Sequence, residues 1–364
     1  MHIARIRLQN FRSYQSLDFQ PAPNLCVLAG ENAAGKTNIL ESLFLCALGR
    51  SHRTRHDGEL IRYGEARARV GLALQGRTGA HEIACDLFRE GRRALRIDGM
   101  PLTRSGELLG HLRVVMFSPE DLRLIKQGPS ERRRFMDMEL SQLNPAYYYR
   151  LQQYNLALKQ RNALLRDGLS TAGALDPWDT QLAQLGAAIM RERHAFMGRI
   201  AVMAAQLHNE LAGDKETLRV NYEPSTPLDE EKAQAAALLK ALRENAIRDK
   251  ERGGTSHGPH RDDVSILVNG MDARAFGSQG QQRTAALSLK LSELTLTREL
   301  GGESPVLLLD DVLSELDGHR QHMLASAMRG CQTFLTCTRP EGLKDAGVGD
   351  MAVYRVHNGM VQTA

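Results

Sequence analysis

Long apolar segments are missing from this sequence of 364 residues. No stretch approaches the 18 consecutive apolar residues of a membrane-spanning helix, and residues 1–5 begin a strand-like pattern rather than a charged and apolar leader. None of the five cysteines lies in a Cys-x-x-Cys pattern, so we expect buried thiols rather than disulfides or zinc ligands. These absences exclude a membrane-embedded or disulfide-stabilised protein and predict a cytoplasmic one.

Lysine is also scarce, since only nine of the 47 basic residues are lysines. Arginine is the better bidentate phosphate ligand, and the formal net charge is +4 with a pI of about 8.8. This excess supports nucleic-acid binding only weakly. The length allows two domains, and 42% apolar with 25% charged residues is typical of a soluble globular protein.

The most informative segment is Gly-Glu-Asn-Ala-Ala-Gly-Lys-Thr at residues 30–37, which has the pattern of a phosphate-binding loop. A continuous apolar run at 25–29 precedes it, and residues 38–45 have helical periodicity, so strand, loop and helix occur in the required order. Backbone amides and the helix N-terminus favour a polyphosphate, Lys36 reaches the outer phosphates, and Thr37 ligates magnesium. The predicted ATP-binding residues of the loop are Gly30, Glu31, Asn32, Ala33, Ala34, Gly35, Lys36 and Thr37.

The segments around this loop indicate strands on both sides of it. Alternating residues at 3–8 and a second strand at 15–19 form a predicted hairpin before the loop. Beyond it, short strands at 68–74 and 82–88 and a hairpin around Asp98-Gly99 predict a β-rich covering sheet, followed by a buried strand at 114–117. From residue 122 to about 253 the chain is predicted to be mainly helical, with helices beginning at 132 and spanning 147–166, 178–211 and 228–251.

A second glycine-containing motif follows a strand at 264–268 and an Asn269-Gly270 turn. Residues 276–283 read Phe-Gly-Ser-Gln-Gly-Gln-Gln-Arg and precede a predicted helix at 284–300. A serine-led turn at a helix N-terminus is an anion site. We therefore consider Ser278 and Gln281 as phosphate-binding candidates.

A third motif is the apolar strand at 306–309, which ends in Asp310 and Asp311. Asp310 is predicted to hold magnesium, directly or through water, and Asp311 to polarise the attacking water. A last strand is expected at 333–336. The polar residues after it, up to Thr338, could sense the terminal phosphate.

Together these motifs resemble the ATP-binding-cassette (ABC) heads of the SMC and Rad50 class of DNA proteins. Within that class the chain resembles the RecF family of bacterial recombination and replication-repair proteins, over nearly its whole length. The resemblance is carried by Asn-Phe-Arg-Ser-Tyr at 10–14, Pro-Glu-Asp at 119–121, Gly-Pro-Ser-Glu-Arg-Arg-Arg-Phe-Met-Asp at 128–137, Gly-Pro-His-Arg-Asp-Asp at 258–263 and Ser-Gln-Gly-Gln-Gln-Arg at 278–283.

The resemblance implies an α/β fold, an ABC-ATPase head with a phosphate-loop sheet and a β-rich subdomain, plus a mainly helical inserted domain. The head is expected at 1–120 and 255–364, and the insertion at 121–254. Arg12 is implied to lie near the phosphates of its own chain. Many relatives carry glycine at the position of Ala33, and alanine there would cost about 1 kcal/mol if the backbone needs a positive φ.

The resemblance further implies an ATP-dependent homodimer, in which Ser278 and Gln281 reach the γ-phosphate bound by the second subunit. With ATP and Mg²⁺, such a protein is expected to be a weak DNA-stimulated ATPase used as a switch. It would bind gapped DNA or junctions of single and double strands, act with RecR and RecO to promote RecA loading, and belong to DNA recombination, repair and the SOS response.

Six arginines are candidates for contacts to the DNA backbone: Arg50, Arg53, Arg55, Arg132, Arg133 and Arg134. The first three follow the phosphate loop, where a solvated loop is the alternative. The last three point in different directions on a helix, and ion pairs with Glu131 or Asp137 are the alternative for two of them.

Two other functions are weighed against this one. A transporter or motor ATPase would normally carry histidine in the switch after the last strand, where this chain has Thr-Cys-Thr at 336–338. A Rad50-like DNA tether would need hundreds of residues of heptads between residues 121 and 253. Neither feature is present in the sequence.

Overall fold

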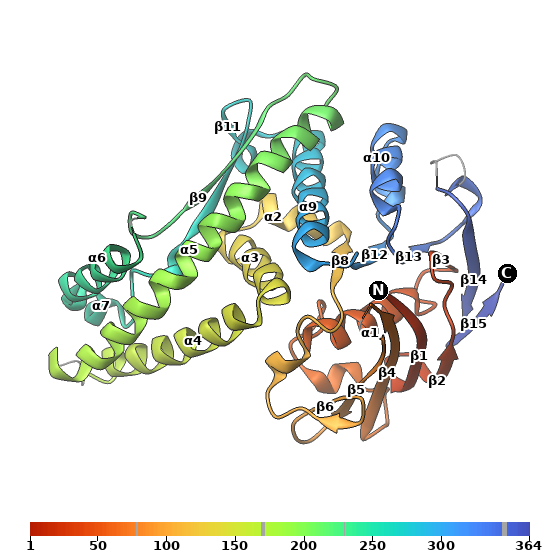
Figure 1. The fold of residues 1–364 in the computed structure, drawn as a ribbon, viewed down its shortest axis with the longest axis horizontal. Helices are drawn as coiled ribbons and strands as arrows, with labels where there is room; N and C mark the ends of the chain where they lie inside the picture. Colours follow the sequence, from red (N-terminus) through yellow and green to blue (C-terminus); the bar gives the residue numbers. More distant parts are fainter. Residues whose placement is uncertain (78, 169–171, 229, 344–347) are drawn as a thin grey trace. The chain divides into compact units, whose positions relative to one another are not determined.

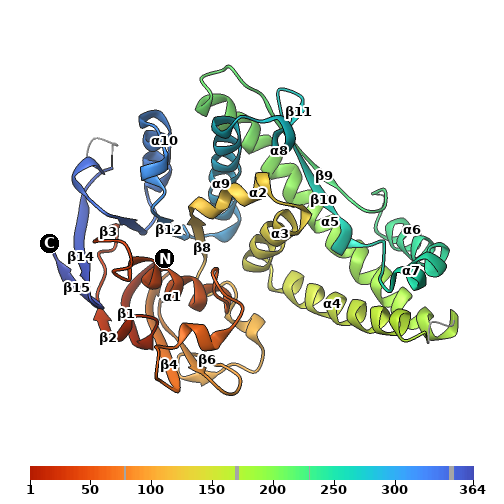
Figure 2. The same ribbon diagram turned by 180° about the vertical axis from the view of Figure 1, so that it is seen from behind.

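The computed structural model describes residues 1–77, 79–168, 172–228, 230–343 and 348–364 and divides into two compact units (Figures 1 and 2). Unit 1 contains Met1–Asp121 and Glu293–Ala364, and unit 2 contains Leu122–Ser292. Among the helices of these ranges, none combines the length and hydropathy needed to cross a membrane.

The first sheet of unit 1 is antiparallel and is drawn in red to orange in Figure 1. Its strands lie in the order β2-β1-β4-β5-β6-β7. Their bounds are β1 (His2–Phe11), β2 (Tyr14–Phe19), β4 (Arg67–Gly76), β5 (Gly79–Phe88), β6 (Ala94–Ile97) and β7 (Met100–Pro101). The predicted turn between β6 and β7 is confirmed, because Asp98 and Gly99 have positive φ values of 51° and 78°, as a tight hairpin requires.

The second sheet of unit 1 has the order β15-β14-β3-β13-β12-β8 and is parallel except for β15. Its strands are β3 (Leu25–Ala29), β8 (Val114–Phe117), β12 (Val306–Asp310), β13 (Thr333–Cys337), β14 (Met351–His357) and β15 (Met360–Thr363). All residues of β3 and β8 are buried, which explains their continuous apolar sequences. Because β13 lies between β3 and β12, the polar residues that follow these three strands meet at one edge.

Helix α1 (Lys36–Leu48) contacts β4 and β5 of the first sheet and β12 and β13 of the second. It is therefore enclosed, and most of its residues are buried. Helix α10 (Gly318–Met328) follows β12 in the chain. The predicted strand–loop–helix order around the phosphate loop is confirmed.

The expectation that residues 333–336 form the last strand is wrong. β14 and β15 follow, and β14 pairs in parallel with β3 on the side opposite to β13. Asn358 and Gly359, with φ values of 47° and 74°, form the turn between β14 and β15. The Asn-Gly pair was the local signal for this hairpin.

Unit 2 contains most of the helices, drawn from yellow to cyan in Figure 1. They are α2 (Arg123–Lys126), α3 (Pro129–Leu143), α4 (Pro145–Arg166), α5 (Ala172–Leu211), α6 (Glu231–Glu244), α7 (Ala246–Arg252), α8 (Ala273–Phe276) and the first part of α9 (Gln279–Gly301). The helix predicted at 228–251 is in fact two helices, which are separated at Asn245. The helix predicted from residue 284 begins at Gln279, because Ser278 caps it.

Unit 2 also contains a small antiparallel sheet of β9 (Leu218–Glu223), β10 (Asp263–Val268) and β11 (Met271–Asp272), in the order β11-β10-β9. β9 was not predicted, although buried Leu218 and Val220 alternate with polar residues. β10 pairs with β9 along its length. Through this pairing, β10 belongs to the compact unit that continues to Ser292.

Candidate nucleotide-binding site

The phosphate loop connects β3 to α1 and is fixed to its surroundings by backbone contacts. The Gly30 amide donates to the Cys337 carbonyl over 3.2 Å. Gly35 has a φ of 106°, and a Cβ at this position would lie 2.9 Å from Ser13 Oγ and 3.0 Å from the Tyr14 hydroxyl. The Tyr14 hydroxyl also donates to the Gly35 carbonyl over 3.1 Å. Glycine is therefore required both by conformation and by the close approach of the β1–β2 turn.

Ala33 has a φ of 66°, a left-handed conformation that is unfavourable for alanine by about 1–2 kcal/mol. The backbone at Ala33 therefore has the positive φ at which alanine was expected to be less stable than glycine.

We predict that Ala33→Gly raises the free energy of unfolding by about 0.5–1 kcal/mol, because the gain from relieving the strain exceeds the added entropy of the unfolded chain. Urea unfolding measures this change. Ala34→Gly is the matched control, since Ala34 does not have a positive φ and should lose stability on the same exchange. Equal destabilisation by both substitutions would contradict the interpretation.

Lys36 folds back onto the loop from the first residue of α1. Its Nζ donates to the Gly30 carbonyl over 2.7 Å and to the Glu31 carbonyl over 2.8 Å. Burial lowers the pKa of the Lys36 ammonium, and the charges of Asp311 and Asp310 partly counter this shift. The ammonium group is thus held among the loop carbonyls, with two carboxylates close enough to affect its charge.

Thr37 and Asp310 meet at the edge of the sheet, although 273 residues separate them. Thr37 Oγ1 donates to Asp310 Oδ1 over 2.8 Å. The Thr336 hydroxyl, at the end of β13, donates to the same oxygen over 2.9 Å and accepts the Asp311 amide over 2.9 Å. The ends of β12 and β13 and the first turn of α1 are therefore linked by one hydrogen-bond network, and Thr336 is the residue of β13 that contacts the predicted magnesium ligand.

Asp311 follows β12 and is exposed. Its φ of 54° is a conformation that aspartate adopts more readily than most residues. Its carbonyl accepts the Ser314 hydroxyl over 2.8 Å. The side chain lies beside Asp310 at the carboxyl end of the strand, where ligands of parallel sheets bind.

Arg12 lies in the turn between β1 and β2 and is oriented by Glu41 of α1. Its Nε and Nη2 donate to the two Glu41 oxygens over 2.8 and 2.7 Å, and Nη1 donates to the Glu59 carbonyl over 2.8 Å. Burial by itself raises the pKa of Glu41, but hydrogen bonds from Arg12 and Ser51 and nearby positive charge outweigh it, so the pKa lies below its ordinary value. Sequence reasoning missed Glu41, because an acidic residue on a helix carries no sign of a partner 29 positions away.

A hollow of about 580 Å³ adjoins the turn and the start of α1. Its lining includes Arg12, Ser13, Asn38, Tyr63 and Arg89. Asn38 Nδ2 donates to Ser13 Oγ over 3.0 Å, which places this wall directly beside Gly35. Tyr63 is fully exposed. The hollow offers a phosphate-loop ligand a place for a nucleoside, and none of its lining residues except Arg12 was predicted.

The arginines after α1 differ in their contacts. Arg53 donates to Asn38 Oδ1 over 3.2 Å and lies 3.5 Å from Glu41, with 44% of its side chain exposed. Arg50 and Arg55 are exposed. All three lie in unit 1, close in sequence to the helix that begins at the phosphate loop.

Arg132 of α3 is engaged inside unit 2. Its Nε and Nη2 donate to the two oxygens of Asp263 over 2.7 and 2.9 Å, and Nη1 donates to the Gln127 carbonyl over 2.9 Å. Only 8% of the residue is exposed. Its ion-pair partner is therefore neither of the two acids considered from the sequence, and its guanidinium faces the protein.

Arg133 and Arg134 lie next to it on α3. Arg133 Nη1 donates to the Asp262 carbonyl over 2.7 Å, whereas Arg134 lies 3.8 Å from Glu131 and keeps 38% of its side chain exposed. The ion pair of Arg134 with Glu131 agrees with the alternative considered from the sequence. Asp137, the other acid considered there, pairs instead with Arg193 of α5.

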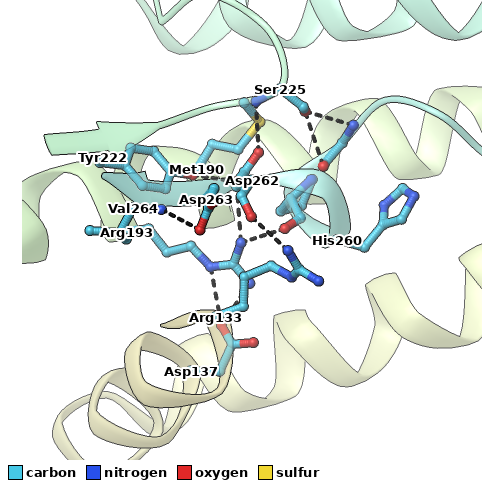
Figure 3. Close-up of polar contacts among 12 residues, drawn as sticks. Arg133, Asp137, Met190, Arg193, Tyr222, Ser225, His260, Asp262, Asp263 and Val264 are labelled. Carbon is cyan, nitrogen blue, oxygen red and sulfur yellow. Dashed lines mark hydrogen bonds and ion pairs between the residues drawn. The ribbon is translucent and has the colours of Figure 1, made fainter. Parts of the chain in front are cut away.

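The Gly-Pro-His-Arg-Asp-Asp motif packs around that Arg193 in the interior of unit 2 (Figure 3). Arg193 donates to Asp137, to the Pro259 carbonyl and to Asp262, which also accepts the Tyr222 hydroxyl. Burial lowers the pKa of His260 to about 4, so the ring is neutral at pH 7. We therefore assign a structural role to this motif.

The serine-led turn caps α9. The Gln281 amide donates to Ser278 Oγ over 3.2 Å, and the Ser278 amide donates to Gln281 Oε1 over 2.9 Å, which is a reciprocal capping box. Gln281 Nε2 donates to Glu216 over 3.0 Å. The side chain of Ser278 is exposed, whereas both ends of the Gln281 amide group are engaged within unit 2.

The chain matches the family described as "RecF/RecN/SMC N terminal domain" over residues 2–362. The "DNA replication and repair protein RecF" of Alkaliphilus oremlandii is 44% identical over 364 residues, which cover 99% of this chain and 100% of that protein. The protein of the same name from Clostridium beijerinckii is 41% identical over 361 residues, with 99% and 98% covered.

Solved structures show the same relationship. "The recombination mediator protein RecF-ATPrS in RecFOR pathway" has a TM-score of 0.92 and 34% identity, with 100% of this chain and 98% of that chain covered. An Smc head domain with an extended coiled coil, derived from Pyrococcus furiosus, has a TM-score of 0.59 and 14% identity, with 100% and 96% covered, and is similar in fold alone. The chain therefore belongs to the RecF family and has the fold of an ABC-type ATPase head.

Proposed function

We propose that this chain is an ATP-dependent DNA-binding protein of DNA replication and recombinational repair, which uses slow ATP hydrolysis as a switch. The observation that carries the proposal is the meeting of Thr37, Asp310 and Thr336 beside the phosphate loop. Family membership supports it, because relatives are named DNA replication and repair proteins and one solved RecF is described with a nucleotide in the RecFOR pathway.

Both the phosphates and the nucleoside of ATP fit the site. The loop amides and the Lys36 ammonium suit the phosphates, while the hollow beside Ser13 and Tyr63 suits the nucleoside. The oxygen atoms of Thr37 and Asp310, 2.8 Å apart, fit Mg²⁺, which prefers oxygen ligands and in such sites takes few of them from the protein. Mg²⁺ bound there would neutralise charge on the phosphate oxygens.

We predict that Tyr63→Ala weakens ATP binding about 5-fold to 150-fold, because stacking of a base on an aromatic ring contributes about 1–3 kcal/mol. Little stability should be lost, since Tyr63 is fully exposed. Calorimetry with ATP measures the affinity for the whole nucleotide, and calorimetry with inorganic tripolyphosphate measures the affinity for the phosphates alone. Tripolyphosphate affinity should stay unchanged, and an equal loss for both ligands would contradict a nucleoside site.

For hydrolysis we assign the water-polarising role to Asp311. Aspartate is shorter than glutamate by one methylene and is held by its backbone contact to Thr336. The carboxylate therefore reaches less far toward an attacking water, and we expect slow turnover that DNA stimulates. Lys36 would hold the charge that develops on the phosphates.

The exposed Ser278 turn suits a ligand held by another copy of the chain. We propose a head-to-tail dimer in which ATP bound at the phosphate loop of one subunit is closed by Ser278 of the second. Loss of the γ-phosphate on hydrolysis would then allow the dimer to open. The assignment of residues 1–120 and 255–364 to the ATPase head and of 121–254 to an inserted lobe stays a prediction.

The test is the mass of the protein in solution, measured by light scattering without nucleotide, with ATP, and with a gapped duplex. We expect a monomer that becomes a dimer only with ATP. A mass that does not change under any of these conditions would reject the dimer and the clamp, but would leave nucleotide binding intact.

For DNA we propose backbone contacts without base readout, at gaps or junctions of single and double strands. Arg50, Arg53, Arg55 and Arg134 are retained as contacts, whereas the engaged guanidinium groups of Arg132 and Arg133 are assigned to structure. By the same family argument we propose that the protein acts with RecR and RecO to promote RecA loading.

The DNA contacts predict a salt dependence. Each neutralised phosphate contributes about −0.9 to the slope of log K against log salt, so the four arginines of each subunit contribute roughly −3.6 to the slope. Arg53→Ala combined with Arg55→Ala should reduce this contribution by about 2 per subunit. Fluorescence anisotropy of a gapped duplex from low to high salt measures it, with Arg355→Ala of β14 as a control. A slope near zero would reject the clamp.

A further inference from the structure

The Gln281 side chain is held from two directions. Its Oε1 accepts the Ser278 amide over 2.9 Å, and its Nε2 donates to Glu216 Oε1 over 3.0 Å. Ser278 Oγ in turn accepts the Gln281 amide over 3.2 Å. A glutamine at a helix start normally makes only the first of these contacts. The second fixes the rotamer on which the geometry of the turn depends.

Glu216 also contacts the interior of unit 2. Its Oε2 lies 3.4 Å from Nε2 of His208, a fully buried residue of α5. His208 Nδ1 lies 3.4 Å from Ser288 Oγ, and that hydroxyl donates to the Thr284 carbonyl of α9. The contacts thus lead from the exposed turn through Glu216 into the interior and back to the helix that the turn caps.

The backbone that carries Glu216 is also constrained. Gly213 and Asp214 have positive φ values of 61° and 59°, and the Thr217 amide donates to Asn269 Oδ1 over 2.8 Å. Glu216 therefore lies between a tight turn after α5 and the start of β9. It is 23% exposed, so its side chain is largely covered.

We propose that Glu216 is a positioning residue for the Ser278 turn, acting through Gln281. The inference rests on the proposed function, in which Ser278 closes the nucleotide site of a second subunit. A carboxylate next to an anion-binding turn adds no attraction for a phosphate. Its contribution is to order Gln281, and so the Ser278 amide and hydroxyl, before the subunits meet, which lowers the entropy lost on association.

The test compares Glu216→Ala with Glu216→Gln. Alanine removes the acceptor for Gln281 Nε2, and we expect the dissociation constant of the ATP-dependent dimer to rise about fivefold to tenfold. Glutamine keeps an oxygen at the same place, and we expect it to stay within about twofold of the unmodified protein. ATP affinity at protein concentrations where the chain is monomeric should be unchanged in both. Glu223→Ala, at the exposed end of β9, is the matched control.

Hydrogen exchange of the peptide spanning residues 276–284 provides a second readout on the monomer. Exchange should be faster in Glu216→Ala and unchanged in Glu216→Gln. Dimerisation of Glu216→Ala as tight as, or tighter than, that of the unmodified protein would overturn the inference, and so would equal loss in both variants. Failure of the unmodified protein to dimerise with ATP would instead reject the proposed function, and this inference with it.

Discussion

Lys36→Ala is expected to abolish ATP-driven dimerisation and to weaken ATP binding by at least 30-fold. Lys36 supplies the positive charge at the phosphate loop, and removing one partner of a close, partly desolvated charge pair costs about 2–5 kcal/mol. In the structure its ammonium also joins the Gly30 and Glu31 carbonyls, so the loop loses an internal support as well.

Calorimetry with ATP and light scattering measure the two effects. Lys240→Ala is the matched control, because Lys240 is an exposed residue of α6 with 74% of its side chain accessible. A Lys36→Ala protein that still binds ATP with unchanged affinity would contradict the assignment of the nucleotide site.

Ser278→Arg is expected to block dimerisation while leaving ATP binding by the monomer unchanged. The side chain of Ser278 is exposed, so a long arginine can be accommodated in the monomer but would occupy the space of the partner's phosphates. Loss of the helix cap should cost about 1 kcal/mol of stability, which is small for a chain of this size.

Ser278→Asn distinguishes loss of the helix cap from steric blocking of the partner's phosphates. Asparagine is an equally good N-cap residue and is much smaller than arginine. This variant should retain the stability of the unmodified protein and part of the dimerisation. If Ser278→Arg lost ATP binding in the monomer, the model of a contact between subunits would be contradicted, since the turn would then act within its own chain.

Lys36 and Ser278 belong to two halves of the nucleotide site, and these halves are expected to come from different subunits. Mixing Lys36→Ala with Ser278→Arg protein therefore gives a further comparison. One composite site in the mixed dimer would combine an intact loop with an intact turn, and partial ATP-dependent association is expected from the mixture but from neither variant alone.

The sequence by itself determined the local elements and the chemistry of the loop. The order of strand, phosphate loop and helix, the buried strand ending in Asp310, and the Asp98-Gly99 and Asn269-Gly270 turns all follow from short-range patterns. These patterns depend on periodicity and on the backbone preferences of a few residues, so no distant contact is needed to recognise them. The resemblance of the motifs also indicated the RecF family correctly.

Only the tertiary structure decided which distant residues meet. Thr336 contacts Asp310 because β13 lies between β3 and β12, and strand order does not follow from strand sequence. Likewise, Arg132 is paired with Asp263, 131 residues away, and Gln281 with Glu216, 65 residues away. Charged side chains of one type look alike in a sequence. Whether an arginine faces solvent or a buried carboxylate depends on packing, which is why the individual roles of these residues required the fold.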